Sequence, residues 1–367
     1  MKHLFSVLSA TFFSMPAFSQ ITWPADGNKK ASVSEDIGIT TVTIQYSRPG
    51  VKGREGKIWG NLVHYGFADL HYGTSNAAPW RAGANENTTL EVSTEVSVEG
   101  KPLKAGKYGF FVAMGPDSAT VVLSNFNTAW GSFYYDPKDD ALRVRVPVKK
   151  VDTSVEWLKY EFINQTDSSA VLSLQWEKML IPVTISVDIH KIQIESFRKE
   201  FNSGIFYRYW QNMQMAANYC LVHNINLDEG LSWAERSINT FFGETNFQTL
   251  STYAGLLEKT GHKKEADSVM KKALPMGSVV DLFNYGYSLA KGGETAIAYK
   301  ILKSNFDKAP ADDFAILGMS IAYYVTGKKT EAIKLAKEGK EKAQQPDFKS
   351  FYGSLISKME AERNIFQ

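Results

Sequence analysis

The sequence predicts a two-part α+β protein, in which an antiparallel β-sandwich is followed by an array of α-helical repeats. Up to about residue 190, short runs of alternating polar and apolar residues are separated by Gly/Pro turns. Beyond it, amphipathic segments recur with a period of roughly 33 residues, which is typical of paired helices. We expect a signal peptide at 1–19, a β-sandwich domain at 20–190 and a helical repeat domain at 191–367.

The first residues have the layout of a secretion signal. Lys2 opens a short basic region, and Leu4–Phe13 is a mostly apolar run too short to span a bilayer. Pro16 breaks this run, and Ala17-Phe18-Ser19 supplies the small-x-small pattern of a cleavage site. We expect cleavage after Ser19 and an exported protein, periplasmic or extracellular. No later apolar run is long enough to predict a membrane span.

Composition narrows the classes of partner. The net charge is only +2 and is spread over both halves, which argues against a nucleic-acid partner. The single cysteine, Cys220, excludes an intrachain disulfide and is predicted to be a buried small residue. The sequence contains no P-loop, no nucleophile elbow and no dinucleotide-binding glycine pattern after a strand. We therefore expect no cofactor and favour a protein without a catalytic site.

Strand signals are dense in the first half, and turn residues such as those of Gly115–Ser118 separate them. The apolar positions of Leu90–Val98 stay in step, which predicts one uninterrupted strand there. Strands at this spacing, with no long helix among them, favour an antiparallel sandwich. The predicted strands are Thr41–Tyr46, Leu90–Val98, Tyr108–Ala113, Thr120–Ser124, Leu142–Val148, Val155–Ile163, Ala170–Trp176 and Ile181–Asp188.

Four segments of the first half carry a family resemblance. They are YSRPGVKGREGKIWGNLV from Tyr46, WRAGANE from Trp80, LKAGKYGFF from Leu103 and WGSFYYDPKDDALRV from Trp130. Together they resemble the DUF2911 family, a domain of exported bacterial proteins, over roughly residues 30–185. The resemblance implies no activity, because the family has none assigned. Phe67–Pro79 stands as an insertion between two family segments.

The segment Trp80–Glu86 is the main candidate site. Trp80 offers a flat apolar face, Arg81 a forked donor, and Asn85 and Glu86 acceptors, which together would suit a small polar ligand or a sugar. The alternative, which we favour, is a structural loop in which Arg81 pairs with Glu86 or with backbone.

The aromatic run around Trp130 and Tyr134 is similarly ambiguous, since exposed rings bind sugars and buried rings build sandwich cores. A period of two would bury half of the run, and we favour a role in the core.

Other chemistry has weaker support. His64, His71, Asp69 and Glu86 could ligate a metal, but their spacing matches no known signature, and we expect no metal site. A hydrolase could use Glu86 with Asp69 or Asp136 as its carboxylates.

One turn in the first half is rich in basic residues. Arg48, Lys52 and Arg54 could bind an anion there, although a solvated turn is favoured.

The second half resembles tetratricopeptide-like repeats. Gly261 and Gly327 lie in matching TGxKxEA segments 66 positions apart, with Gly293 between them. Each glycine is expected to end the first helix of a pair in a left-handed conformation. We expect four helix pairs and a closing helix at Asp347–Ala361. An earlier helix from Ile192 to Tyr209 should pack against the sandwich or the first repeat.

These observations favour an exported, non-catalytic binding or scaffold protein. Helical arrays of this kind present a surface that binds a protein or peptide partner. The alternatives are a carbohydrate-binding module, with an envelope glycan as its partner, and a hydrolase that uses the sandwich loops.

Overall fold

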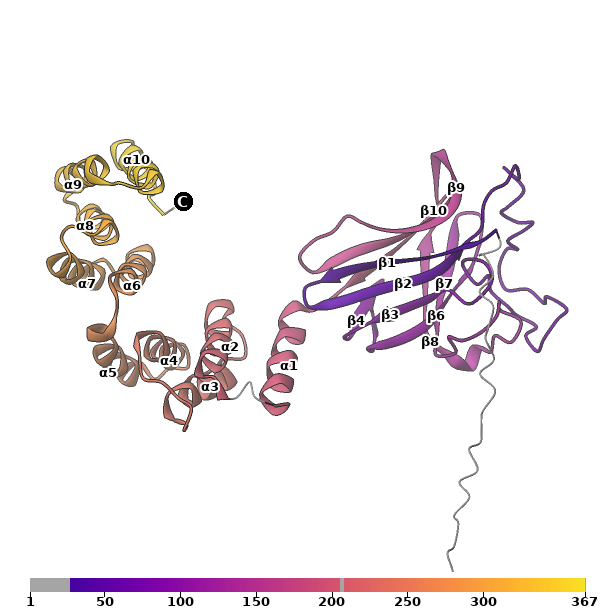
Figure 1. The fold of residues 1–367 in the computed structure, drawn as a ribbon, viewed down its shortest axis with the longest axis horizontal. Helices are drawn as coiled ribbons and strands as arrows, with labels where there is room; N and C mark the ends of the chain where they lie inside the picture. The colour runs from indigo at the N-terminus through magenta and orange to yellow at the C-terminus, as the bar shows by residue number, and fades with distance from the viewer. Residues whose placement is uncertain (1–26, 205–207, 367) are drawn as a thin grey trace, which may run out of the picture. The chain divides into compact units, whose positions relative to one another are not determined.

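The computed structural model describes residues 27–204 and 208–366, so the predicted signal peptide lies outside the described residues. The chain divides into two compact units, one ending at Gln193 and the other beginning at Ile194. The first unit holds two antiparallel sheets and the second an array of helices, which confirms the predicted fold class (Figure 1).

The first unit is a β-sandwich of a six-stranded and a four-stranded sheet. The strand orders are β1-β2-β3-β6-β7-β8 and β5-β4-β10-β9, and all paired neighbours are antiparallel. The strands are β1 Lys29–Ile37, β2 Thr40–Arg48, β3 Thr89–Val92, β4 Val96–Val98, β5 Lys101–Leu103, β6 Gly106–Ala113, β7 Ser118–Ser124, β8 Asp140–Pro147, β9 Lys149–Ile163 and β10 Ser169–Ser186.

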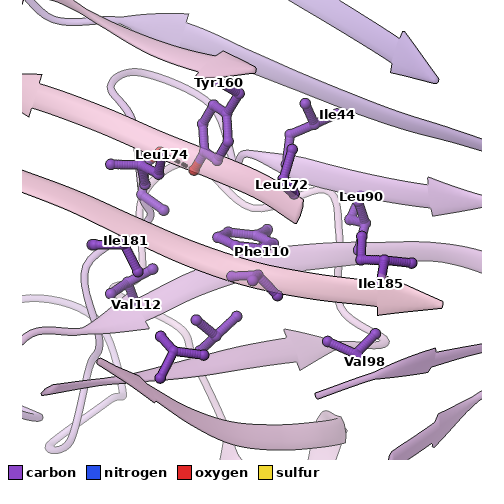
Figure 2. Close-up of a cluster of buried hydrophobic side chains, with 14 of the residues drawn as sticks. Ile44, Leu90, Val98, Phe110, Val112, Tyr160, Leu172, Leu174, Ile181 and Ile185 are labelled. Carbon is purple, nitrogen blue, oxygen red and sulfur yellow. Dashed lines mark hydrogen bonds between the residues drawn. The ribbon is translucent and has the colours of Figure 1, made fainter. Parts of the chain in front are cut away.

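Alternating residues of both sheets fill the space between them. On the six-stranded sheet, Ile44, Phe110 and Val112 point inward at no more than 1% exposure, because successive side chains of a strand face opposite sides. Leu172 and Leu174 of β10 pack against them in the same core (Figure 2). Burial of this apolar surface is the main stabilising contribution to the sandwich.

Three of the predicted strands were delimited wrongly. Leu90–Val98 is not one strand, because the chain passes from one sheet to the other between β3 and β4. Its apolar residues stay in step because both pieces face the same core. Conversely, the two runs from Ala170 to Asp188 form the single strand β10, whose register is broken by a bulge at Glu177, where φ is +51°.

Strands β1 and β5 were missed. β1 is an edge strand with mostly exposed or half-buried polar residues, so its apolar alternation is weak. β5 is three residues long and contains Pro102, which reads as a turn.

The described part of the second unit is built from α helices. Their bounds are α1 Ile189–Asn202, which begins in the first unit, α2 Trp210–His223, α3 Leu227–Asn239, α4 Phe247–Lys259, α5 Lys263–Ala273, α6 Val279–Lys291, α7 Thr295–Lys308, α8 Asp313–Val325, α9 Lys329–Lys342 and α10 Pro346–Glu360. Consecutive helices from α2 to α9 form four packed pairs, and α10 packs on α9. Four pairs and a closing helix are as the sequence predicts.

The predicted helix ends are confirmed at three equivalent glycines. Gly261, Gly293 and Gly327 have φ values of +90°, +90° and +83°. In each case the next residue donates its N–H to the carbonyl five residues back, as His262 does to Leu257 at 2.7 Å. The helix repeat therefore follows from one C-terminal capping motif used three times.

Other local expectations are met in part. Cys220 is fully buried between α2 and α3, and burial raises the pKa of its thiol to about 11. The N-cap residue of α3 is Asn226, and Asp228 lies in the first turn of the helix. The predicted helix from Ile192 to Tyr209 ends at Asn202 in the structure, and residues 205–207 lie outside the described residues.

Candidate functional site

Trp80 anchors the predicted site to the sandwich core. Its backbone exchanges hydrogen bonds with Val112 at 2.8 and 3.0 Å, and its indole Nε1 donates to the Gly83 carbonyl at 3.2 Å. The ring stacks on Trp176 with 6.0 Å between centroids, and Trp59 packs edge-on against both. Trp80 is therefore a buried packing residue, and its position fixes the residues that follow.

The segment after Trp80 is drawn tightly against β2. A Cβ at Gly83 would lie 2.7 Å from Thr88 Oγ1 and 3.1 Å from the Ser47 carbonyl, so only glycine permits this approach. Asn85 has φ +58°, and its Oδ1 accepts a hydrogen bond from Asn28 Nδ2 at 3.3 Å.

Because the chain turns here, Arg81 and Glu86 face different pockets. The sequence allowed Arg81 to pair with Glu86 or with backbone, and the pairing with Glu86 is wrong, because Glu86 pairs with Lys30 instead.

Arg81 lies in a pocket of about 290 Å³ at the loop end of the sandwich, which we call the arginine pocket. Its main lining residues are Arg54, His64, Trp80, Arg81, Ser132 and Trp176. They come from segments up to 122 positions apart in the sequence, and three of the four family-like segments contribute to them. The fold thus gathers these segments around one cavity.

The polar atoms of the arginine pocket are poorly satisfied. Within the described residues, Arg81 Nε, His64 Nδ1 and Trp176 Nε1 are buried and have no hydrogen-bond partner. Burial also lowers the pKa of Arg81, because the charged guanidinium loses water. Arg54 is better satisfied, since its Nε and Nη2 donate to the carbonyls of Val51 and Gly50 at 2.9 and 2.7 Å.

Glu86 lines a second, larger cavity of about 490 Å³ with Lys30 and Lys107, which we call the lysine pocket. Its carboxylate binds Lys30 Nζ at 2.7 Å and accepts a hydrogen bond from Ser47 Oγ at 3.3 Å. The hydrogen bond from Lys30 is the main cause that lowers the pKa of Glu86. The pair is exposed, so it contributes little to stability.

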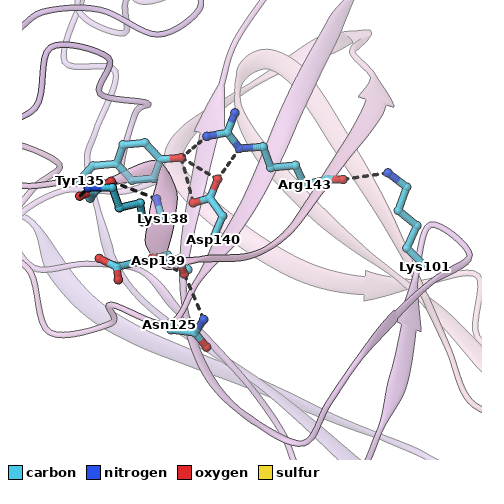
Figure 3. A network of polar contacts seen from close by, with 9 residues as sticks. Lys101, Asn125, Tyr135, Lys138, Asp139, Asp140 and Arg143 are labelled. Carbon is cyan, nitrogen blue, oxygen red and sulfur yellow. Dashed lines mark hydrogen bonds and ion pairs between the residues drawn. The ribbon is translucent and has the colours of Figure 1, made fainter.

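The aromatic run is divided between surface and core. Trp130 is 61% exposed and Tyr134 52% exposed, whereas Tyr135 is buried. Tyr135 is held by a polar network with Asp140 and Arg143, in which Arg143 Nη2 donates to its hydroxyl at 2.7 Å (Figure 3). Tyr135 therefore anchors this loop, while Trp130 and Tyr134 present open rings to solvent.

The remaining candidates are dispersed. Asp69 interacts with the exposed His71, with 3.6 Å from Oδ2 to Nδ1, and Asp136 caps a short 3-10 helix through the Lys138 N–H. Glu86 and these two aspartates therefore have separate partners, and neither aspartate lines the lysine pocket with Glu86. His64 alone of this group lines the arginine pocket.

The three basic side chains of the Arg48–Arg54 turn point to different partners. Arg48 Nε donates to the Leu158 carbonyl at 2.9 Å, and Lys52 lies over the Trp157 ring. The expectation of a solvated turn is wrong for Arg54, which is half-buried and reaches the arginine pocket.

The helical unit contains a separate polar groove. Every residue that lines this cavity of about 240 Å³ comes from α2, α4 or α6, the first helices of three consecutive pairs. Figure 1 shows α4, α6 and α8 on one side of the array and α5, α7 and α9 on the other. The lining residues, which define the polar groove, are Gln214, Asn218, Phe247, Gln248, Ser251, Thr252, Asp281, Asn284 and Tyr285.

Amide side chains dominate the polar groove. Gln214 Nε2 donates to Thr252 Oγ1 at 2.9 Å and so links α2 to α4. Asn218, Gln248 and Asn284 are exposed on three successive first helices. The repeat was predictable from the sequence, but the row of amide side chains on α2, α4 and α6 was not. The period alone does not show which faces of these helices line a common groove, because that depends on how the helices pack.

Comparison with known proteins identifies a family match for the β-sandwich unit. Residues 28–185 match the family described as "Protein of unknown function (DUF2911)". The match spans nearly the whole β-sandwich, whose strands run from Lys29 to Ser186. No curated protein shows significant similarity to the chain.

A solved structure titled "MamA RS-1 ArsTM double mutant" is 17% identical to this chain. The alignment covers 42% of this chain and 84% of that one, with a TM-score of 0.29. None of the helices in residues 27–204 and 208–366 has the length and apolar character needed to cross a bilayer.

Proposed function

We propose that this protein is an exported, non-catalytic binding protein of the periplasm or cell envelope, and that its polar groove holds an extended peptide segment of a partner protein. The observation that supports this proposal is the row of amide side chains on α2, α4 and α6. An amide carries both a donor and an acceptor, so it can match the alternating N–H and C=O groups of an extended backbone. Export rests on the signal-like first 19 residues.

The partner's side chains would add little charge selectivity in this groove. The polar groove contains one acidic residue, Asp281, whose carboxylate already caps α6 by hydrogen bonding the Ser278 N–H at 3.0 Å. Phe247 and Tyr285 pack against each other beside it, with 6.4 Å between ring centroids. The polar groove therefore suits a peptide segment that has small or apolar side chains and unpaired backbone N–H and C=O groups.

Site-specific photo-crosslinking in cells that produce the full chain tests this proposal. A photoreactive residue replaces Asn284 in the polar groove, and the control replaces Ile297, which is 48% exposed on α7. We expect adducts with a recurrent protein at position 284 and none at position 297. Equal labelling at both positions would mean that the polar groove is not the binding surface.

A synthetic peptide from the crosslinked region then gives the affinity. The double variant Asn218→Ala/Asn284→Ala should weaken its binding by about 10–30-fold, since two amide hydrogen bonds contribute about 1 kcal/mol each. Asn239→Ala, an exposed amide on α3, is the matched control and should bind normally.

The exposed rings of Trp130 and Tyr134 support a second candidate, a glycan-binding surface on the sandwich. Titration of envelope oligosaccharides against the Trp130→Ala/Tyr134→Ala variant tests it. Sugar binding that survives both substitutions would exclude these rings as the stacking platform.

A further inference from the structure

The arginine pocket contains two positive charges that the surrounding protein does not neutralise. Arg54 and Arg81 both line it, and no aspartate or glutamate is among its lining residues in the described part of the chain. Arg54 donates to two backbone carbonyls, and Arg81 has no hydrogen bond or ion pair within the described residues. A guanidinium remains charged in proteins, so both residues retain a full positive charge.

Three side chains that line this pocket each carry a buried nitrogen without a hydrogen-bond partner in the described part of the chain. Arg81 Nε and His64 Nδ1 are buried without partners, and so is Nε1 of Trp176, which is only 1% exposed. Leaving a buried donor unsatisfied costs about 1–3 kcal/mol, and more when the group is charged. Arg81 Nε and Trp176 Nε1 are donors in every protonation state of the folded protein, and both side chains line one small pocket whose contents could supply acceptor oxygens.

The position of the Arg81 guanidinium depends on a glycine beside it. Gly131 has φ +75°, and a Cβ there would lie 2.7 Å from Arg81 Nη1. Trp80, the preceding residue, is fixed by its backbone bonds to β6 and its stacking on Trp176. The Arg81 guanidinium therefore lies close against the Gly131 turn, with its forked donors left unused.

The remaining walls are apolar. Leu62, Val63 and Leu70 line the pocket together with Trp80 and Trp176. A volume of about 290 Å³ lies at the small end of the range for ligand sites. A guanidinium fork matches a carboxylate in bidentate geometry, and the indole and aliphatic walls favour an uncharged body.

We propose that the arginine pocket binds a small organic monocarboxylate, with its carboxylate on Arg81 and Arg54 and its apolar body against Trp80 and Trp176. This site lies in the β-sandwich and is independent of the peptide groove. The carboxylate would accept hydrogen bonds from the Arg81 guanidinium and neutralise charge that is otherwise buried at a cost. The aliphatic and aromatic walls would select against small hydrophilic anions.

The test is an NMR titration of the full chain with hexanoate, benzoate, inorganic phosphate and the neutral analogue hexanamide. The reporter is the indole N–H resonance of Trp176, assigned with the Trp176→Phe variant. We expect saturable shifts with hexanoate or benzoate, and binding at least tenfold weaker for hexanamide. A response to hexanamide equal to that of hexanoate, or no response to either acid at millimolar concentration, would overturn the proposal. Tighter binding of phosphate would overturn the carboxylate assignment.

Variants separate a ligand site from a structural arginine. Arg81→Gln should weaken hexanoate binding at least tenfold while the unliganded protein melts at the same or a higher temperature, because a buried unpaired charge is removed. Arg81→Lys keeps the charge without the fork and should lose less affinity. Arg145→Gln, an exposed arginine that donates to Ser118 Oγ outside the pocket, is the matched control and should bind normally.

Melting of Arg81→Gln well below wild type, with unchanged carboxylate affinity in the folded fraction, would make Arg81 structural and refute the proposal. The groove variant Asn218→Ala/Asn284→Ala should leave carboxylate binding intact. Failure of one site is thus distinguishable from failure of the other.

Discussion

Two adjacent glycines at the end of α6 allow the backbone strain of the repeat motif to be measured. Gly293 has φ +90°, and a Cβ there would meet no heavy atom within 4 Å. Gly292 has φ −76°, and its Cβ would make only ordinary contacts, at 3.4 and 3.6 Å from the carbonyl oxygens of Ser288 and Leu289. Alanine fits in the available space at both positions, so the two substitutions differ mainly in native backbone strain.

The expected difference follows from this geometry. Gly→Ala reduces the entropy of the unfolded chain equally at both sites, which stabilises the folded state by about 0.4–1 kcal/mol. At Gly293 the alanine must also adopt the left-handed region, at a cost of about 1–2 kcal/mol. Gly292→Ala should therefore be neutral or stabilising, and Gly293→Ala should be less stable than Gly292→Ala by about 1–2 kcal/mol.

Urea unfolding of the full chain, followed by the helical circular dichroism signal, measures both free energies of unfolding. For a unit of this size the difference corresponds to roughly 2–8 °C in Tm. Unchanged m values would show that only the folded state was affected. Equal destabilisation by the two substitutions would refute the assignment of Gly293 as the left-handed cap, and with it the physical basis of the repeat.

Three further outcomes are expected. Gly261→Val and Gly327→Val should each destabilise the helical unit by about 1 kcal/mol or more, because a β-branched residue is disfavoured at positive φ; unchanged melts for both would contradict this. Cys220 should resist a thiol-specific reagent at neutral pH in the folded protein and react on unfolding, because it is buried and the pKa of its thiol is raised to about 11. Rapid labelling of the folded protein would instead show that α2 and α3 separate readily. N-terminal sequencing of exported protein should begin at Gln20, and an intact Met1 would exclude cleavage after Ser19.

Local chemistry made much of the architecture predictable. The glycine of each repeat is followed by a short polar turn, and that pattern alone located three helix ends that the structure confirms. Alternation located most of the strands for the same reason, since one buried face requires a period of two. Where the pattern was weak, as in the edge strand Lys29–Ile37, the prediction failed.

The candidate site was only partly predictable. Trp80 and Arg81 were selected because their side chains suit binding, but their neighbour Glu86 faces a different cavity. The bend that separates them depends on the close approach of Gly83 to β2, which is a tertiary contact. His64 entered the sequence reasoning only as a metal candidate, and its place beside Arg81 could not be read from spacing.

Sequence alone determined the two-part architecture and the helix repeat, because periodicity, turn chemistry and capping are local properties of the chain. It also indicated export, which remains a prediction from the first 19 residues. Tertiary structure decided which polar groups share a cavity and which of them lack partners. Arg54, Arg81 and Trp176 are brought together only when two sheets pack and their loops fold over one end. Whether a buried arginine is paired depends on every segment around it, so its capacity to bind a ligand is a property of the folded domain.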